Sequence, residues 1–350
     1  MPHLEGIKSQ IIQTSRLKMH VLTAGPDDGT PVIFIHGNGA SSTFWEETMV
    51  SLPPGFRAIA PDMRGYGETE PAPIDATLGL GDMVEDIRSL VEAMGIKKFH
   101  IVGHSMGGGI AMKYAIAYPQ DLLSMTLVAT MSPYGYSGSK DVDGTPCYDD
   151  GAPAGAGSVN PEFVRLLKEK DRSTDNPMSP RNVLRQFYFK PPFIPAREEE
   201  LLEALLSMRI GEDWYPGNFV PSPHWPGVAP GNRGVINAIS RKYFDASGIV
   251  EIQPKPPVLW VRGADDLVIS NSAMWDIATL GALGFVPGWP GPQECPPQPM
   301  LDQIRAVLDR YRANGGYYRE VVIPDCGHTP FIEKPEEFNA IFHRFLMGEE

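Results

Sequence analysis

The sequence predicts an α/β fold in which a mostly parallel central sheet, flanked by helices, carries a large inserted lid. Three observations predict it: β-rich runs alternate with helix-like segments over residues 1–131, the alternation resumes at residue 256, and the stretch 132–255 lacks it. Such alternation is typical of a parallel sheet covered on both faces. The intervening stretch is too long for a loop and should form its own layer. We therefore expect a core domain of residues 1–131 and 256–350, and a lid or cap of residues 132–255.

Short β-rich runs bounded by glycine, proline or aspartate mark the strands of the core. Two helices are predicted between these runs: residues 80–95, whose apolar residues recur with helical spacing, and residues 108–119, which are rich in alanine and end at a proline. A further helix is expected at residues 336–346. The predicted strands cover residues 7–13, 17–25, 31–37, 56–62, 97–104, 122–130, 256–263 and 317–325.

The amino-acid composition of the lid changes along its length. Residues 132–161 are rich in Gly, Pro, Ser and Asp and should be irregular, whereas residues 162–171 and 197–211 have helical spacing. A second stretch, 281–300, is dense in proline and can be neither helix nor central strand. Most lid aromatics should pack in the lid itself, but some should face a pocket and favour a bulky, largely apolar ligand. They are Tyr134, Tyr136, Phe187, Tyr188, Phe189, Phe193, Trp214, Tyr215, Phe219 and Trp225.

The composition restricts the partners and the compartment. A net charge of −13 without a basic cluster argues against nucleic acid. Three scattered cysteines give no disulfide framework, and we find neither a leader nor an apolar run long enough for a membrane span. No histidine spacing indicates a metal site. We therefore expect a soluble cytoplasmic protein without metal or cofactor, whose partner is a small molecule; its oligomeric state stays open.

Residues 102–109, VGHSMGGG, place one serine among glycines between a predicted strand and a predicted helix. Gly103, Ser105 and Gly107 fit G-x-S-x-G, a sharp turn that presents a serine hydroxyl above a sheet. The glycines are needed there because the strand and the helix press close. The pattern indicates that Ser105 is a nucleophile rather than an ordinary turn residue.

A nucleophilic serine needs a base to accept its proton and a third group to orient that base. Two other predicted strands supply both: Asp265 and Asp266 follow the strand at 256–263, and His328 follows the strand at 317–325. The order along the chain is Ser, Asp, His. The two adjacent aspartates are equivalent by position, so residue spacing alone leaves the choice between them open.

The chain resembles the α/β-hydrolase superfamily on four motifs taken in order: HGNGASS, PDMRGYGET, GHSMGG, and GADD with GHTPFIEKP. The resemblance covers residues 8–131 and 256–347, not the lid. It implies that Asp266 is the triad acid. It also implies that the backbone N–H groups of Asn38 and Met106 form an oxyanion hole, because fixed donors suit a developing negative charge.

HGNGASSTFW also looks like the corresponding stretch of haloalkane dehalogenases, in which the asparagine side chain faces the pocket. Those enzymes use an aspartate followed by tryptophan where this sequence has Ser105 and Met106, so alkyl-halide and epoxide chemistry are both disfavoured. A serine beside hydrogen-bond donors suits acyl carbon.

These observations predict a cofactor-independent serine hydrolase, of the esterase or lactonase kind, that forms an acyl-enzyme with Ser105, Asp266 and His328. Two alternatives remain open at this point. One is a carbon–carbon bond hydrolase with the same triad, and the other is a ligand-binding homologue without turnover.

Overall fold

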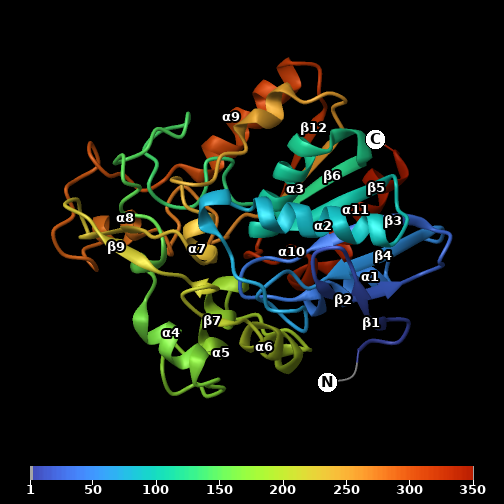
Figure 1. The fold of residues 1–350 in the computed structure, drawn as a ribbon, viewed down its shortest axis with the longest axis horizontal. Coiled ribbons are helices and arrows are strands. Elements are labelled where there is room, and N and C mark those ends of the chain that lie inside the picture. The colour runs from blue at the N-terminus through green and yellow to red at the C-terminus, as the bar shows by residue number, and fades with distance from the viewer. Residues whose placement is uncertain (1–2, 350) are drawn as a thin grey trace.

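An eight-stranded sheet forms the centre of the molecule in the computed structural model, which describes residues 3–349 (Figure 1). Its strand order is β1-β2-β4-β3-β5-β6-β11-β12. Strands β1 and β2 pair antiparallel, β2 runs antiparallel to β4, and all later neighbours are parallel. The strands are β1 (Lys8–Gln13), β2 (Lys18–Ala24), β3 (Thr30–Ile35), β4 (Phe56–Pro61), β5 (Phe99–His104), β6 (Leu122–Val128), β11 (Val258–Gly263) and β12 (Tyr318–Ile323).

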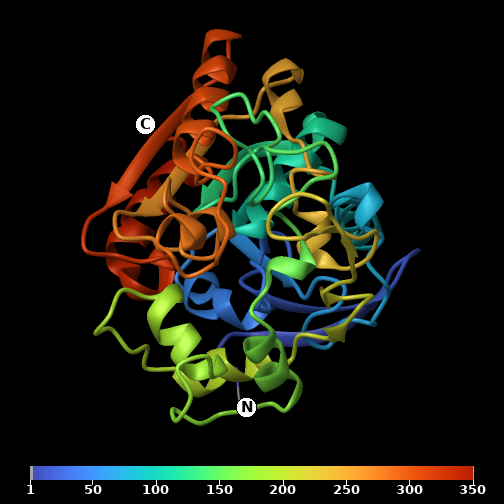
Figure 2. The same ribbon diagram turned by 90° about the vertical axis from the view of Figure 1, so that its left-hand side faces the viewer.

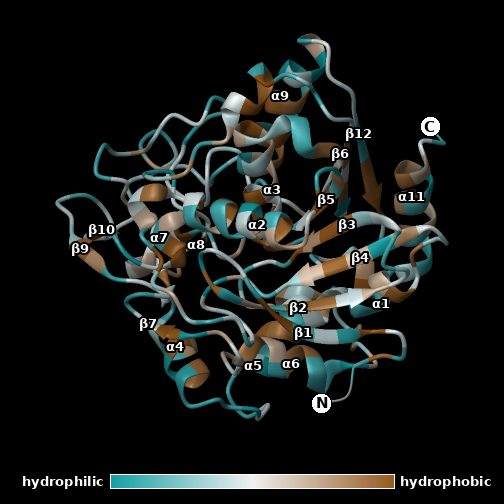
Figure 3. Cartoon of the chain, turned by 45° about the vertical axis from the view of Figure 1, so that its right-hand side comes forward, coloured by the Kyte–Doolittle hydropathy of each residue, from teal (hydrophilic) through white to brown (hydrophobic). Residues whose placement is uncertain are grey.

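Helices cover the sheet on both faces, as the alternation predicts. α2 packs on α3 on one face, and α1 packs on α11 on the other (Figure 1). β5 is buried at every position, which is typical of a parallel strand with both faces covered. Figure 3 shows the apolar strands inside and the polar loops outside. The helices of the core are α1 (Glu46–Val50), α2 (Gly81–Ala93), α3 (Met106–Ala117), α9 (Met300–Ala313), α10 (Pro330–Glu333) and α11 (Pro335–Met347).

Helix α9 is an element that the sequence analysis did not predict. Its buried face consists mainly of Ile304, Val307, Leu308 and Tyr311, at spacings of three, one and three residues. This is regular helical periodicity, so the signal was present in the sequence. The sequence analysis predicted neither helix nor central strand for the proline-dense residues 281–300, and α9 begins where that stretch ends.

Two insertions cover the end of the sheet where β5, β11 and β12 terminate (Figure 2). The first is the stretch 132–255, whose initial part is irregular, as expected, up to residue 155. Its elements are α4 (Pro161–Lys168), α5 (Pro180–Val183), a π-helical turn at Leu184–Tyr188, α6 (Glu198–Leu206), β7 (Ile210–Gly211), β8 (Tyr215–Pro216), β9 (Phe219–Pro221), β10 (Val228–Pro230) and α7 (Val235–Ala238). The helix predicted at 197–211 therefore ends earlier than expected, at Leu206.

The second insertion follows β11 and contains α8 (Ile277–Ala282), after which residues 283–299 form no helix or strand. Hydrogen bonds join it to the first insertion. The Ser137 hydroxyl donates to Asp276 at 2.9 Å, and Nε1 of Trp225 donates to the carbonyl of Pro287 at 2.9 Å. The cover of the sheet is thus built from both insertions. Within residues 3–349, no helix combines the length and apolar character needed to cross a bilayer.

Candidate active site

Ser105 occupies a strained turn between β5 and α3. Its φ of 54° and ψ of −117° lie outside the conformations that a side chain normally allows. Backbone hydrogen bonds hold the turn: the Ser105 N–H donates to the Val128 carbonyl at 2.9 Å, and the Ser105 carbonyl accepts from Gly108 and Met131 at 3.0 and 3.1 Å. Neighbouring strands and the start of α3 therefore fix the serine in place.

The two flanking glycines allow this turn to close. A Cβ on Gly103 would lie 2.2 Å from the carbonyl oxygen of Gly107. A Cβ on Gly107 would lie 2.3 Å from the carbonyl oxygen of Ile35 on β3. Both distances are shorter than real contacts, so the G-x-S-x-G pattern is a packing requirement of the strand and helix around Ser105.

His328 and Asp266 meet beside this turn, on the loops after β12 and β11. Nδ1 of His328 donates to Oδ2 of Asp266 at 2.8 Å, and the two residues are 2% and 6% exposed. Oδ1 of Asp266 accepts from the N–H groups of Val268 and Ile269 at 2.7 and 2.9 Å. These bonds leave Nε2 as the free nitrogen of the imidazole.

Asp265 points elsewhere, although it is adjacent in sequence. Its carboxylate is largely exposed and pairs with Nζ of Lys190 at 3.0 Å. The structure therefore brings Asp266, and not Asp265, to the histidine. Of the two aspartates, the hydrogen bond to His328 favours Asp266 as the group that orients it.

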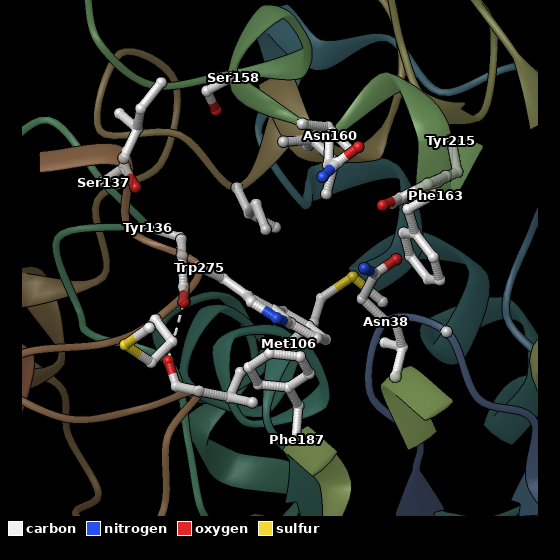
Figure 4. Close-up of a pocket in the computed structure, with 18 of the residues that line it drawn as sticks. Asn38, Met106, Tyr136, Ser137, Ser158, Asn160, Phe163, Phe187, Tyr215 and Trp275 are labelled. Carbon is white, nitrogen blue, oxygen red and sulfur yellow. Dashed lines mark hydrogen bonds between the residues drawn. The ribbon is translucent and has the colours of Figure 1, made fainter. Parts of the chain in front are cut away.

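Ser105 and His328 line one cavity, together with Asn38 and Met106. Within residues 3–349 the Ser105 hydroxyl makes no hydrogen bond, so it is free to turn toward an acceptor in the cavity. Met106 is the first residue of α3, whose N–H has no intrahelical acceptor. The N–H of Asn38 likewise donates to no described residue. Figure 4 shows Asn38 and Met106 side by side on the cavity wall.

Two tyrosines hold Asn38. The Tyr66 hydroxyl donates to Oδ1 of Asn38 at 2.7 Å, and the Tyr188 hydroxyl donates to the Asn38 carbonyl at 2.9 Å. Burial raises the pKa of both phenols well above the ordinary value, so both stay protonated donors. With Oδ1 occupied, the Nδ2 group of Asn38 turns into the cavity (Figure 4).

A buried carboxylate clamps the loop that carries His328 to the lid. Glu333 accepts from the N–H of Gly327 at 3.1 Å and from the N–H of Lys190 at 3.0 Å. The Thr329 hydroxyl donates to the Tyr188 carbonyl at 2.7 Å. Burial raises the pKa of Glu333. The lid and the histidine loop are thus held as one unit.

His104 and His36 both hydrogen-bond to backbone groups. Nε2 of His104 donates to the His328 carbonyl at 2.9 Å. Nδ1 of His36 donates to the Gly37 carbonyl at 2.8 Å, and Nε2 accepts from the N–H of Met63 at 3.0 Å. Burial lowers the pKa of both imidazoles, which therefore stay neutral.

The cavity has a volume of about 670 Å³. Its wall is formed mostly by apolar side chains of both insertions, among them Phe163, Met178, Phe187, Met208, Met274 and Trp275. Of the lid aromatics singled out in the sequence, Tyr136, Phe187, Tyr188 and Tyr215 do face it. The part of the chain that the structure describes contains no group of three or more His, Cys, Asp or Glu able to hold a metal.

Several residues of this site were not predicted. Tyr66 belongs to a motif noted in the sequence, and Tyr188 was counted only as a lid aromatic. The roles of both depend on Asn38, which is distant in sequence from both. Glu333 lies five residues after His328 in the motif GHTPFIEKP, and this closeness in sequence was the sign that it could contact the histidine loop.

Comparison with known proteins agrees with this architecture. A family model described as the alpha/beta hydrolase fold matches residues 30–144, which include the Ser105 turn. "Putative carbamate hydrolase RutD" of Variovorax paradoxus is 34% identical over 117 residues, covering 33% of this chain and 44% of the relative. "Epoxide hydrolase 2" of Siraitia grosvenorii is 30% identical over 142 residues, covering 40% of this chain and 44% of the relative. The chain thus spans less than half the length of these relatives.

Among solved structures, an esterase from Exiguobacterium antarcticum has a TM-score of 0.60 at 18% identity, with 97% of this chain and 100% of that chain covered. A likeness at this identity shows the fold. Together with the family match over residues 30–144 and the order of the strands, it shows that this chain has the α/β-hydrolase fold. The resemblance drawn from the four motifs is confirmed.

Proposed function

We propose that this chain is a cofactor-independent serine hydrolase that cleaves a carboxylic ester or lactone bearing a bulky, largely apolar group. One observation carries the proposal: Ser105, on its strained turn, lines the same cavity as His328, whose Nδ1 is bonded to Asp266. This combination supplies a nucleophile, a base and a group that orients the base.

Acylation begins when Nε2 of His328 accepts the Ser105 proton as Oγ attacks the carbonyl carbon of the ester. The negative charge that develops on the carbonyl oxygen accepts hydrogen bonds from the N–H groups of Asn38 and Met106, which have no other acceptor. Asp266 stabilises the imidazolium. The C–O bond to the alcohol then breaks, and His328 returns the proton to the leaving alkoxide.

Deacylation repeats these steps with water. His328 accepts a proton from the water as its oxygen attacks the acyl-enzyme, and the same two N–H groups hold the oxyanion. The Ser105 ester bond breaks, Oγ regains a proton from His328, and the acid leaves. With a lactone the alcohol stays attached to the acyl chain, so one hydroxy acid is released.

The cavity supports the choice of substrate. Its volume and apolar wall suit a bulky acyl or alcohol group, because such pockets hold a ligand mainly by apolar burial. Epoxide opening, the reaction that one relative's name gives, is disfavoured because residue 105 is a serine and not a carboxylate.

The experiment compares wild-type protein with Ser105→Ala on p-nitrophenyl esters from acetate to decanoate. We expect turnover by the wild type, an optimum at the longer acyl chains, and a loss of about 10⁴-fold or more in kcat for the variant. Circular dichroism serves as the folding control. Equal activity of the two folded proteins, or none in either, would overturn the proposal.

A further inference from the structure

The cavity beside Ser105 carries no formal charge on its wall. Among the described residues that line it there is no Asp, Glu, Lys or Arg. A charged ligand would therefore be desolvated there without a partner, which is strongly unfavourable. The ligand part that fills this cavity is neutral.

Most polar side chains on the wall already have partners. The Tyr136 hydroxyl donates to the Val268 carbonyl at 2.8 Å, and the Ser158 hydroxyl donates to the Gly155 carbonyl at 2.8 Å. These groups serve to build the cover. Their hydroxyl protons already have acceptors within the protein, so they require no acceptor on a ligand.

Two lid donors differ from them. Oδ1 of Asn160 accepts from the N–H of Glu162 at 2.9 Å, which caps α4, so the Nδ2 group is left over. Within residues 3–349 neither Nδ2 of Asn160 nor the hydroxyl of Tyr215 donates to any acceptor. Figure 4 shows the amide of Asn160 and the hydroxyl of Tyr215 directed into the same side of the cavity.

The two residues differ in exposure, because Asn160 is exposed whereas Tyr215 is buried. Tyr215 is 5% exposed, and its ring lies 6.4 Å from that of Phe163. Burial raises the pKa of the Tyr215 phenol, which keeps it a donor at every ordinary pH. Both donors line the cavity without a described protein acceptor, so each can bond to an acceptor on a ligand, and the apolar wall beside Tyr215 strengthens that bond. Within residues 3–349, Nε1 of Trp275 and Nδ2 of Asn38 also donate to no acceptor, but Trp275 approaches from another wall and Asn38 lies on the core (Figure 4).

We propose that Asn160 and Tyr215 form an anchor for a neutral, hydrogen-bond-accepting oxygen in the apolar part of the substrate. The substrate class is then an ester or lactone with a second oxygen, such as a ketone, ether or further ester, remote from the scissile carbonyl. The inference rests on the proposed function, because it adds specificity to the same cavity. The anchor is on the lid and the nucleophile is on the core, so one substrate spans both.

The test uses p-nitrophenyl decanoate and its 5- to 9-oxo derivatives, which differ from it only by one carbonyl oxygen. We expect wild-type protein to prefer one oxo ester over decanoate by about tenfold in kcat/KM, the size of one or two hydrogen bonds. In Tyr215→Phe this preference, taken relative to the decanoate rate of the same variant, falls to about threefold or less. Tyr118→Phe removes a hydroxyl that donates to Glu85 outside the cavity, and as the matched control it keeps the preference.

Asn160→Asp provides a second variant, because its carboxylate still caps α4 but offers no donor. It should lose the preference as Tyr215→Phe does. Binding measured by calorimetry in Ser105→Ala gives the same comparison as a ratio of Kd values, without turnover. No preferred oxo ester, or a preference that survives in both variants, overturns the anchor. A wild type inert toward decanoate overturns the proposed function instead, and the Kd ratio still decides the anchor.

Discussion

Replacing Asp266 with asparagine tests how the geometry of the site sets the proton on His328. Oδ1 of Asp266 accepts two backbone N–H bonds, at 2.7 and 2.9 Å, and Oδ2 accepts from His328 at 2.8 Å. In Asp266→Asn the amide oxygen must stay with the backbone donors, because a flip would break two hydrogen bonds of about 1 kcal/mol each and oppose N–H to N–H. The amide nitrogen then faces Nδ1 of His328.

A donor facing Nδ1 forces that nitrogen to accept, so the proton of the neutral imidazole moves to Nε2, where it blocks the base. We expect kcat to fall by roughly 10⁴-fold, or about 5.5 kcal/mol in the activation barrier. Asp265→Asn is the matched control, since Asp265 is exposed and pairs with Lys190 rather than with His328. Initial rates on a p-nitrophenyl ester and thermal melting measure both variants. The reasoning is refuted if Asp266→Asn keeps more than about a tenth of wild-type kcat, or if Asp265→Asn loses as much.

Three further substitutions test other contacts. Gly107→Ala places a Cβ 2.3 Å from a carbonyl oxygen of β3, and should lower the free energy of unfolding in urea by about 2 kcal/mol; an unchanged value contradicts the packing account. Tyr66→Phe frees the Asn38 amide and should reduce kcat/KM about fivefold with little change in Tm, whereas equal rates would show that Asn38 needs no support. Burial alone would raise the pKa of Asp62, but hydrogen bonds from His20 and backbone N–H groups lower it. That stabilisation is present above about pH 4 and is lost as the pH falls through the folded pKa, so Asp62→Asn should flatten the acid side of the Tm profile; an unaltered profile counts against it.

The core could be predicted from the sequence because local patterns determine it. The strands, α2, α3 and α11 all carry regular apolar spacing. The glycines on either side of Ser105 indicate the tight turn, because a side chain there would clash. The pairing of His328 with Asp266 follows from strand ends that meet at one edge of a parallel sheet. Helix α9 had the same kind of signal and was overlooked beside a proline-rich stretch.

The walls of the cavity could not be predicted in this way. Whether Asn160 or Tyr215 has a free donor depends on which acceptors the folded lid leaves nearby, and no spacing rule gives that. The same holds for the hydrogen bond between Tyr66 and Asn38, which joins two separate core motifs. The contribution of the second insertion to the cover also depends on tertiary contacts, such as that between Ser137 and Asp276.

Reaction with an alkyl fluorophosphonate, followed by intact-mass and peptide mass spectrometry, tests the activation of Ser105 most directly. An activated serine attacks phosphorus and releases fluoride, so the mass rises by one phosphonyl group. We predict one adduct per chain, located on the peptide containing Ser105, and its loss in both Ser105→Ala and His328→Ala. A folded wild-type protein that remains unlabelled, or one labelled at another residue, would contradict the account.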